Sequence, residues 1–151
     1  MSAVVAAARG WIGTPYLHQA STRGAGCDCL GLVRGVWREV HGAEPAPVPP
    51  YTADWNEPQG DEALWRTAAG LLRARDRDEP TRPGDLLLFR MRAGAVAKHL
   101  GLAGEVGAHP TFLHAYARHG VVESPLTGPW AARIVARFDF DRRTGATTQT
   151  R

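Results

Sequence analysis

The chain has 151 residues, of which 44% are hydrophobic and 22% charged, a composition that supports one folded domain and excludes a mainly disordered protein. Its formal net charge of +3 is mild and no basic cluster alternates with aromatic residues, so we expect no nucleic-acid binding. No apolar run approaches transmembrane length, and the N-terminus lacks the basic region and apolar core of a secretory signal. We therefore expect neither membrane insertion nor export by the general pathway.

The first predicted elements are a short helix over residues 3–8, which ends near Gly10, and a second helix that begins at Cys29. Asp28 is a good N-cap for this second helix, and Gly42 stands where a positive-φ residue commonly ends one. Gly31 and Gly35 lie inside it and lower its helix propensity. They predict that another chain segment or a substrate packs closely over the helix. The apolar side recurs at intervals of three and four residues: Cys29, Val33, Val36, Trp37 and Val40.

Cys29 is the candidate nucleophile. Unpaired N–H groups at a helix N-terminus favour negative charge, which predicts a lowered pKa for this thiol and more of the reactive thiolate. The alternative is an inert core thiol, since free cysteine is among the most buried residue types. Cys27 is expected to be a small packing residue, with a redox or metal partner of Cys29 as the alternative. A disulfide between the two would be strained.

The middle of the chain changes character. Five prolines between residues 43 and 60 exclude a continuous helix or a central strand there, so we expect a wrapping loop. Its aromatic residues, Tyr51 and Trp55, are expected to pin the loop to the body, or else to line a groove. A helix from Asp61 to about Arg75 follows, with an apolar face typical of scaffold.

Strand patterns dominate the rest of the chain. They cover residues 86–91, 97–103, 112–116, 121–124 and 133–140. Helices first and strands afterwards predict an α+β domain, with the Cys29 helix packed on an antiparallel sheet. Residues 142–151 are polar and are expected to form a disordered tail or an assembly contact.

His99 and His114 lie in two of these strands. Neighbouring strands of an antiparallel meander can place two residues of one face side by side. One imidazole then takes the thiol proton while the other orients it. A single histidine on a strand is more often structural, but this pair occurs together with a capped cysteine.

Four motifs, in their order along the chain, resemble those of the NlpC/P60 cysteine peptidases. They are Asp-Cys-Leu-Gly-Leu-Val at 28–33, Arg-Pro-Gly-Asp-Leu-Leu-Leu-Phe at 82–89, His-Leu-Gly-Leu at 99–102 and Phe-Leu-His-Ala at 112–115. A Gly-Thr-Pro-Tyr element at 13–16 and the segment 120–130 also match, so the resemblance covers residues 11–138. It implies a papain-like core in a single catalytic domain over residues 1–141, with loop 43–60 and helix 61–75 as an insertion.

The resemblance also implies roles for single residues. Cys29 would be the nucleophile, His99 the general base and His114 the residue that orients it, with no metal or cofactor. Tyr16 and Asp28 match positions that line the substrate pocket and hold a free amine of the stem peptide. His18, in the loop after Tyr16, is expected to touch substrate too.

The implied activity is hydrolysis of the stem peptide of bacterial peptidoglycan, most commonly at the D-glutamyl to diaminopimelate bond. Two departures from the family pattern, Leu30 in place of serine and the run at 17–21, look most like the branch of tailed phages and gene transfer agents, as does the proline-rich insertion. We therefore expect tail hub or baseplate partners, synthesis in the cytoplasm, incorporation at a tail tip, and action in the periplasm of the target cell. The alternatives are a peptidoglycan amidase and a structural tail-tip adaptor with a vestigial peptidase fold.

Overall fold

The computed structural model describes residues 2–48, 51 and 60–141. Trp55, most of the proline-rich loop and the tail at 142–151 lie outside the described residues, so the expectations about them stay predictions. The helices are α1 (Ala3–Arg9), α2 (Cys29–His41), α3 (Ala63–Leu71) and α4 (Gly128–Ala131). The strands are β1 (Ser21–Thr22), β2 (Gly26–Cys27), β3 (Arg73–Ala74), β4 (Leu86–Phe89), β5 (His99–Ala103), β6 (Thr111–Tyr116), β7 (Gly120–Pro125) and β8 (Ile134–Asp139).

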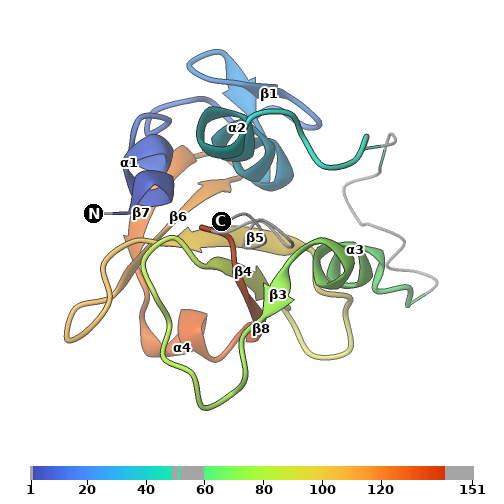
Figure 1. Ribbon diagram of the computed structural model, residues 1–151, viewed down its shortest axis with the longest axis vertical. Coiled ribbons are helices and arrows are strands. Elements are labelled where there is room, and N and C mark those ends of the chain that lie inside the picture. The colour runs from blue at the N-terminus through green and yellow to red at the C-terminus, as the bar shows by residue number, and fades with distance from the viewer. Residues whose placement is uncertain (1, 49–50, 52–59, 142–151) are drawn as a thin grey trace, which may run out of the picture.

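An antiparallel sheet in the order β3-β8-β4-β5-β6-β7 organises the domain. Helices α1 and α2 lie together on one side of the sheet, while α4 lies at the opposite end of the molecule (Figure 1). Helix α2 contacts β5 and β6 directly. The predicted α+β architecture, with the Cys29 helix on an antiparallel sheet, is confirmed. Among the described residues, no helix combines the length and hydropathy that a membrane span requires.

Successive side chains of each strand point to opposite faces of the sheet, and this alternation produces two separate apolar clusters. The larger cluster joins the buried face of α2 to one face of the sheet through residues such as Leu32, Val36, Leu100, Leu102 and Leu113. The smaller one consists of Leu87, Phe89, Ala103 and Phe112, with Trp130 of α4 packed against them. Both faces of the central strands are therefore covered.

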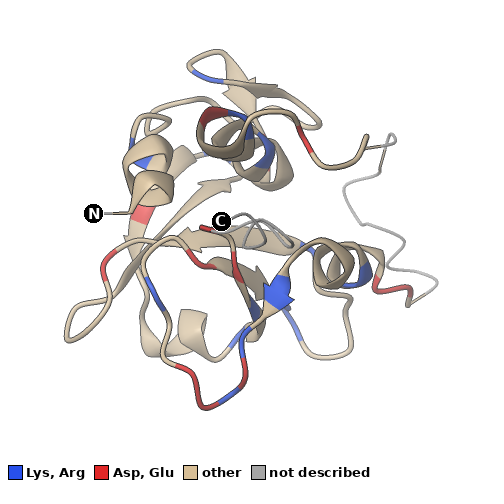
Figure 2. Ribbon diagram, viewed as in Figure 1, with Lys and Arg blue, Asp and Glu red and all other residues tan. Residues whose placement is uncertain are grey.

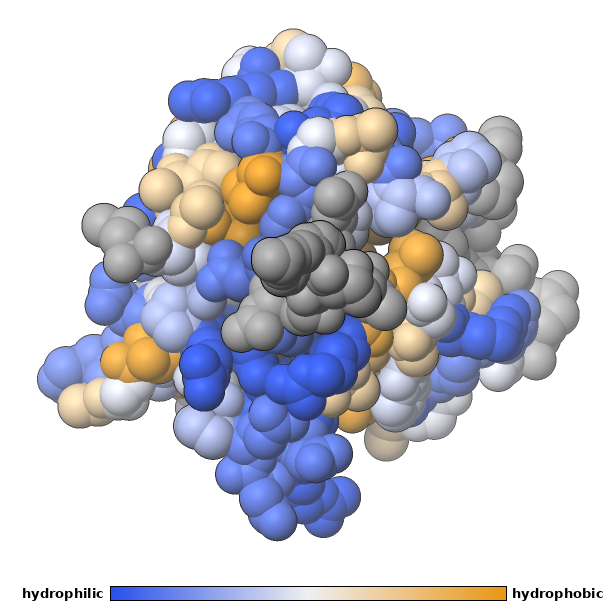
Figure 3. Space-filling view, viewed as in Figure 1, coloured by the Kyte–Doolittle hydropathy of each residue, from blue (hydrophilic) through white to orange (hydrophobic). Residues whose placement is uncertain are grey.

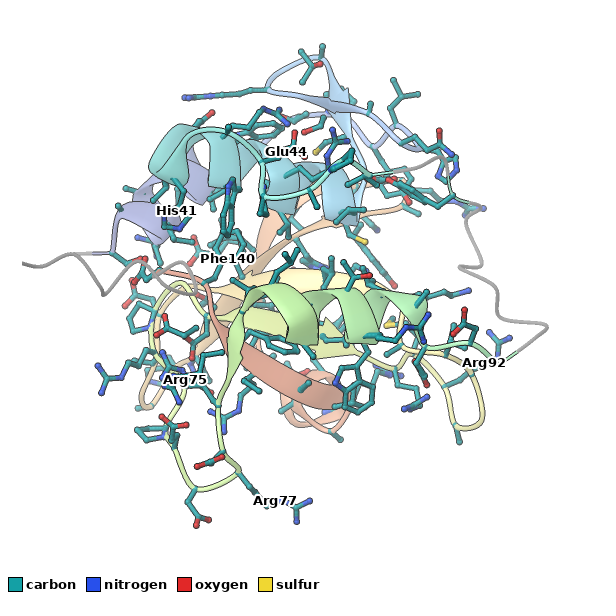
Figure 4. All side chains as sticks on the ribbon, turned by 45° about the vertical axis from the view of Figure 1, so that its right-hand side comes forward. His41, Glu44, Arg75, Arg77, Arg92 and Phe140 are labelled. Carbon is teal, nitrogen blue, oxygen red and sulfur yellow. The ribbon has the colours of Figure 1, made fainter. Side chains whose placement is uncertain are left out.

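Helix α2 begins and ends where its sequence predicts. The Asp28 carboxylate accepts a hydrogen bond from the Gly31 N–H at 2.7 Å, and Gly42 at the C-terminal end has a φ of +89°. At the same end, His41 Nε2 donates to the Phe140 carbonyl at 2.8 Å (Figure 4). The last turn of α2 is thus tied to the chain that follows β8.

Gly31 and Gly35 allow two chain segments to approach α2 closely. A Cβ on Gly31 would lie 1.8 Å from the Ala20 carbonyl oxygen, and one on Gly35 would lie 2.1 Å from the ring of Trp11. Both distances are far below van der Waals contact. The prediction of close packing is confirmed, and in both cases the packing partner belongs to the chain itself.

The helix predicted to run from Asp61 to about Arg75 is shorter in the structure. It ends at Leu71, and Arg73–Ala74 form the edge strand β3, paired with β8. The Arg75 N–H donates to the Arg137 carbonyl at 2.8 Å, which continues this extended pairing. The prediction was wrong at this end because long-range hydrogen bonds to β8 outweigh a weak local helix preference.

A buried ion pair fixes the loop that leads into β4. Arg75 donates to both carboxylate oxygens of Asp85, at 2.7 and 2.9 Å, and the Arg82 N–H donates to the same carboxylate at 2.9 Å. The remaining charged residues of this loop include both signs and give the lower part of the molecule a hydrophilic surface (Figures 2 and 3). The loop is held by polar contacts rather than by an apolar core.

Candidate active site

Cys29 is the first residue of α2, and its side chain lies beside the start of β5. Its Sγ donates a long hydrogen bond to the Lys98 carbonyl at 3.7 Å, and the residue is 9% exposed. It lines a pocket of about 180 Å³ together with His99. Tyr16, His18 and Asp28 line the same pocket, so every sequence-predicted site residue except His114 lines it.

His114 lies behind His99 and completes a polar chain. His99 Nε2 and His114 Nδ1 are 2.8 Å apart, and His114 Nε2 is 3.0 Å from the hydroxyl of Ser124. Strands β5 and β6 are antiparallel neighbours, as predicted, and this pairing is what sets the two rings next to each other. Because Nε2 of His99 is engaged, Nδ1 remains to exchange a proton with the thiol of Cys29.

Aromatic rings enclose the two histidines. The Trp130 ring centroid lies 5.8 Å from that of His99 and 5.2 Å from that of His114, and the Phe112 ring lies 4.2 Å from His114. Burial lowers the pKa of His99 to about 3, with His114 adding to the shift, and lowers the pKa of His114 to about 4. Both imidazoles are therefore neutral at pH 7.

The Cys29 thiol is neutral as well. Burial raises its pKa to about 12, and the Asp28 carboxylate adds to the effect. Hydrogen bonds from the backbone N–H groups of Leu100, Leu30 and Cys29 lower the pKa, as expected at a helix start, but they are the smaller contribution. The lowered pKa predicted from helix position alone is wrong for the free protein, because the tertiary structure covers the sulfur.

The buried histidines make folding stability depend on pH. A histidine with a depressed folded-state pKa contributes stability that is complete above its unfolded pKa of about 6.5 and is lost as the pH falls toward the folded value. His114 alone is thus expected to lower the free energy of unfolding by about 2 kcal/mol between pH 6.5 and pH 4.5. Urea unfolding of the wild type and of His114→Gln at both pH values measures this difference.

The His114→Gln variant is expected to lose about 2 kcal/mol less than the wild type over this interval. Staying above pH 4.5 limits the contribution of carboxylates whose pKa is lowered, such as Glu123. His109→Gln, at an exposed loop position, controls for the number of histidines. Equal losses in the wild type and His114→Gln would contradict a depressed pKa for His114.

Asp28 is held by the protein on both of its oxygens. Oδ1 accepts from the Gly31 N–H, while Oδ2 accepts from the Gln19 N–H at 2.7 Å and from the Tyr51 hydroxyl. His18 Nδ1 lies 3.7 Å from Oδ2. The carboxylate expected to hold a substrate amine therefore also caps α2 and orders the loop before it.

Tyr51 combines the two alternatives open for it from the sequence. It lines the pocket, and its carbonyl accepts from the side chains of Gln19 and His18, so it is also pinned to the body. Tyr16 is bridged to Cys27 through the backbone, and burial raises the pKa of its phenol to about 12. Tyr16 therefore offers a protonated hydroxyl to the pocket.

Sequence reasoning missed several residues of the site. Lys98 and Tyr116 line the pocket, while Ser124 and Trp130 contact the histidines from behind. Tyr116 could be predicted from the strand pattern, since it lies two positions after His114 on the same strand face. Ser124 and Trp130 required the β6–β7 register and the position of α4.

Cys27 and Cys29 are both free thiols and both buried. Cys27 is fully buried in β2, which fits a packing role. In the part of the chain that the structure describes, no group of three or more His, Cys, Asp or Glu side chains is placed to hold a metal ion.

Comparisons with known proteins agree on the fold. The NlpC/p60 domain of the peptidoglycan hydrolase SagA superposes with a TM-score of 0.59 at 24% identity, covering 91% of this chain and 96% of that one. A lipoprotein-like NLP/P60 family protein from Staphylococcus aureus gives 0.56 at 20% identity, covering 91% of this chain and 40% of that one. No curated protein matches the sequence. The NlpC/P60 family model matches residues 13–138, and the chain therefore belongs to the NlpC/P60 family.

Proposed function

We propose that the protein is a cysteine endopeptidase that hydrolyses the stem peptide of bacterial peptidoglycan, at the D-glutamyl to diaminopimelate bond. One observation carries the proposal: the Cys29 thiol at the start of α2 shares a pocket with His99, whose Nε2 is bonded to His114. Membership of a family whose members are generally cysteine hydrolases supports it, as does the shared fold with a peptidoglycan hydrolase domain.

The chemistry follows from the neutral resting state of the pair. His99 Nδ1 accepts the thiol proton as Sγ attacks the substrate carbonyl carbon, so that charge forms only when substrate is present. His99 then gives this proton to the leaving amine as the C–N bond breaks. Water, deprotonated by His99, hydrolyses the thioester and restores the thiol.

The oxyanion formed in these steps needs hydrogen-bond donors near Cys29. Backbone N–H groups at the start of α2 would supply such donors, and one donor typically contributes about 3 kcal/mol. The protonated Tyr16 hydroxyl is a further donor in the pocket. Tyr16, Asp28 and His18 line the pocket and would hold the free amine of the stem peptide.

Digestion of purified Gram-negative peptidoglycan tests the proposal. Mass spectrometry is expected to show new stem-peptide fragments with the wild type and none with Cys29→Ala, because only the former has a nucleophile. Cys27→Ala is the matched control, since it removes a buried thiol that does not line the pocket, and it is expected to retain cleavage. The mass of the fragments names the bond.

Other results would favour the alternatives. Release of intact stem peptides from the sugar would indicate an amidase. Cleavage that survives in Cys29→Ala would contradict the assigned nucleophile. If neither protein produces fragments, alone or docked in its particle, the structural adaptor becomes the better account.

We also propose that the protein acts from the tail tip of a phage or gene transfer agent, bound to tail hub or baseplate proteins and opening the cell wall for DNA delivery. The run at 17–21 and the proline-rich segment support this assignment, since they depart from the usual family pattern. Synthesis in the cytoplasm and action in the target periplasm follow from such an assembly. Proteomics of purified particles tests it, and absence of the chain from them excludes it.

A further inference from the structure

The polar chain behind Cys29 continues beyond the second histidine. His114 Nε2 lies 3.0 Å from the Ser124 hydroxyl, and in the described part of the chain this is the only hydrogen bond of that nitrogen. His114 itself is 1% exposed, so water does not replace a missing partner. The rings of Phe112 and Trp130 pack against His114, and neither ring has a lone pair that could accept its proton.

The geometry of β6 and β7 places this serine. Phe112 is directly opposite Ser124, and His114 is opposite Val122, so His114 and Ser124 are diagonal neighbours on one face of the hairpin. Six consecutive residue pairs fix this register, from Thr111 with Pro125 to Tyr116 with Gly120. The contact is therefore built into the sheet and does not depend on a loop.

The role of His99 as a base determines where the protons of the chain must lie. To accept the thiol proton at Nδ1, His99 must carry its own proton on Nε2 and donate it to His114 Nδ1. His114 must then carry its proton on Nε2, where the Ser124 hydroxyl accepts it. Only this arrangement leaves the lone pair of His99 available to the thiol of Cys29.

Loss of the serine hydroxyl reverses the preferred position of the proton on the His114 ring. An N–H on His114 Nε2 would then be buried without an acceptor, which is unfavourable. Moving that proton to Nδ1 satisfies it, because His99 Nε2 is 2.8 Å away and can accept. His99 would then hold its proton on Nδ1 and could not serve as the base.

We infer that Ser124 is a positioning residue that fixes the tautomer of His114, and through it the tautomer of His99, in the form that can accept the thiol proton. The inference rests on the proposed function for its catalytic meaning. Its structural content, the tautomer of His114 in the free protein, is measurable without any substrate.

The sharpest test compares Ser124→Thr with Ser124→Val, two side chains of nearly the same shape that differ by a hydroxyl and a methyl group. Both are β-branched and suit a strand, so either substitution is compatible with β7. Thr127→Val is the control, since Thr127 is exposed just before α4 and its side chain makes no capping hydrogen bond. Thermal unfolding checks that all variants are folded.

The first readout is the ¹⁵N chemical shift of the histidine ring nitrogens at pH 7.5, with His114 assigned by its loss in His114→Asn. The wild type, Ser124→Thr and Thr127→Val are expected to carry the His114 proton on Nε2, and Ser124→Val on Nδ1. An unchanged His114 tautomer in Ser124→Val would overturn the inference, whatever the activity.

The second readout is the cleavage rate of the stem peptide identified by digestion. Ser124→Val is expected to lower kcat by about 10- to 100-fold with KM within about twofold, as for other residues that orient a catalytic group. Ser124→Thr is expected to stay close to the wild type. A wild-type protein with no activity would contradict the proposed function, whereas the nitrogen spectra would still decide the role of Ser124.

Discussion

Replacing His99 by glutamine is expected to lower kcat for stem-peptide cleavage by about 10³- to 10⁴-fold while leaving the domain folded. Glutamine cannot accept the thiol proton, and the Cys29 pKa of about 12 leaves almost no thiolate to react without a base. Because burial lowers the His99 pKa to about 3, the substitution exchanges one neutral side chain for another and leaves no buried charge unpaired. Rates on the identified peptide and thermal unfolding measure the two effects.

His114→Gln provides the comparison. Its amide oxygen can still accept from His99 Nε2, so the loss in kcat is expected to be smaller, about 10- to 100-fold. We therefore expect kcat to decrease in the order wild type, His114→Gln, His99→Gln, because His99 exchanges the proton directly and His114 acts only through His99. If His99→Gln cleaves as fast as His114→Gln, His99 is not the base that this geometry assigns.

Gly31→Ala is expected to reduce the free energy of unfolding by about 3 kcal/mol, the upper end of typical overpacking costs. The new Cβ would lie 1.8 Å from the Ala20 carbonyl oxygen, a backbone atom that can move only if the loop before α2 moves. That loop also bonds Asp28 through the Gln19 N–H, so its displacement disturbs the helix cap. Urea unfolding at pH 7 measures the change.

Gly70→Ala is the matched control for this substitution. Gly70 lies in the exposed part of α3, and a Cβ there meets no atom within 4 Å. Alanine has the higher helix propensity, so this variant is expected to be more stable by about 0.5–1 kcal/mol. If packing decides the outcome, the free energy of unfolding falls in Gly31→Ala and rises in Gly70→Ala. Equal changes in the two variants would show that contact with Ala20 does not determine the effect.

The sequence predicted the fold where local signals are strong. The cap and spacing of α2, the positions of the main strands along the chain and the need for small residues at Gly31 and Gly35 can all be predicted from local sequence. The end of α3 was not, because pairing of β3 with β8 joins Arg73 to Asp139, 66 positions apart. Long-range hydrogen bonds leave little local trace.

In the candidate site, too, the features set by local sequence were predictable and those set by tertiary contacts were not. The helix start of Cys29 and the strand positions of His99 and His114 were predicted, and the pairing of β5 with β6 then joined the two rings. The protonation of Cys29 was not predictable, since it depends on what covers the sulfur rather than on its place in the helix. Ser124 likewise becomes visible only through the β6–β7 register.

The carboxylate of Asp28 divides its two oxygens between separate tasks. Oδ1 faces into the helix and bonds Gly31, while Oδ2 meets Gln19, Tyr51 and His18 at the pocket. Position 28 is therefore held fixed by the demands of folding, and the Tyr51 hydroxyl helps to hold its carboxylate, whereas the exposed His18 ring lies 3.7 Å from it. New substrate preferences on this scaffold can evolve by exchange at position 18, with the helix, its cap and its nucleophile left intact.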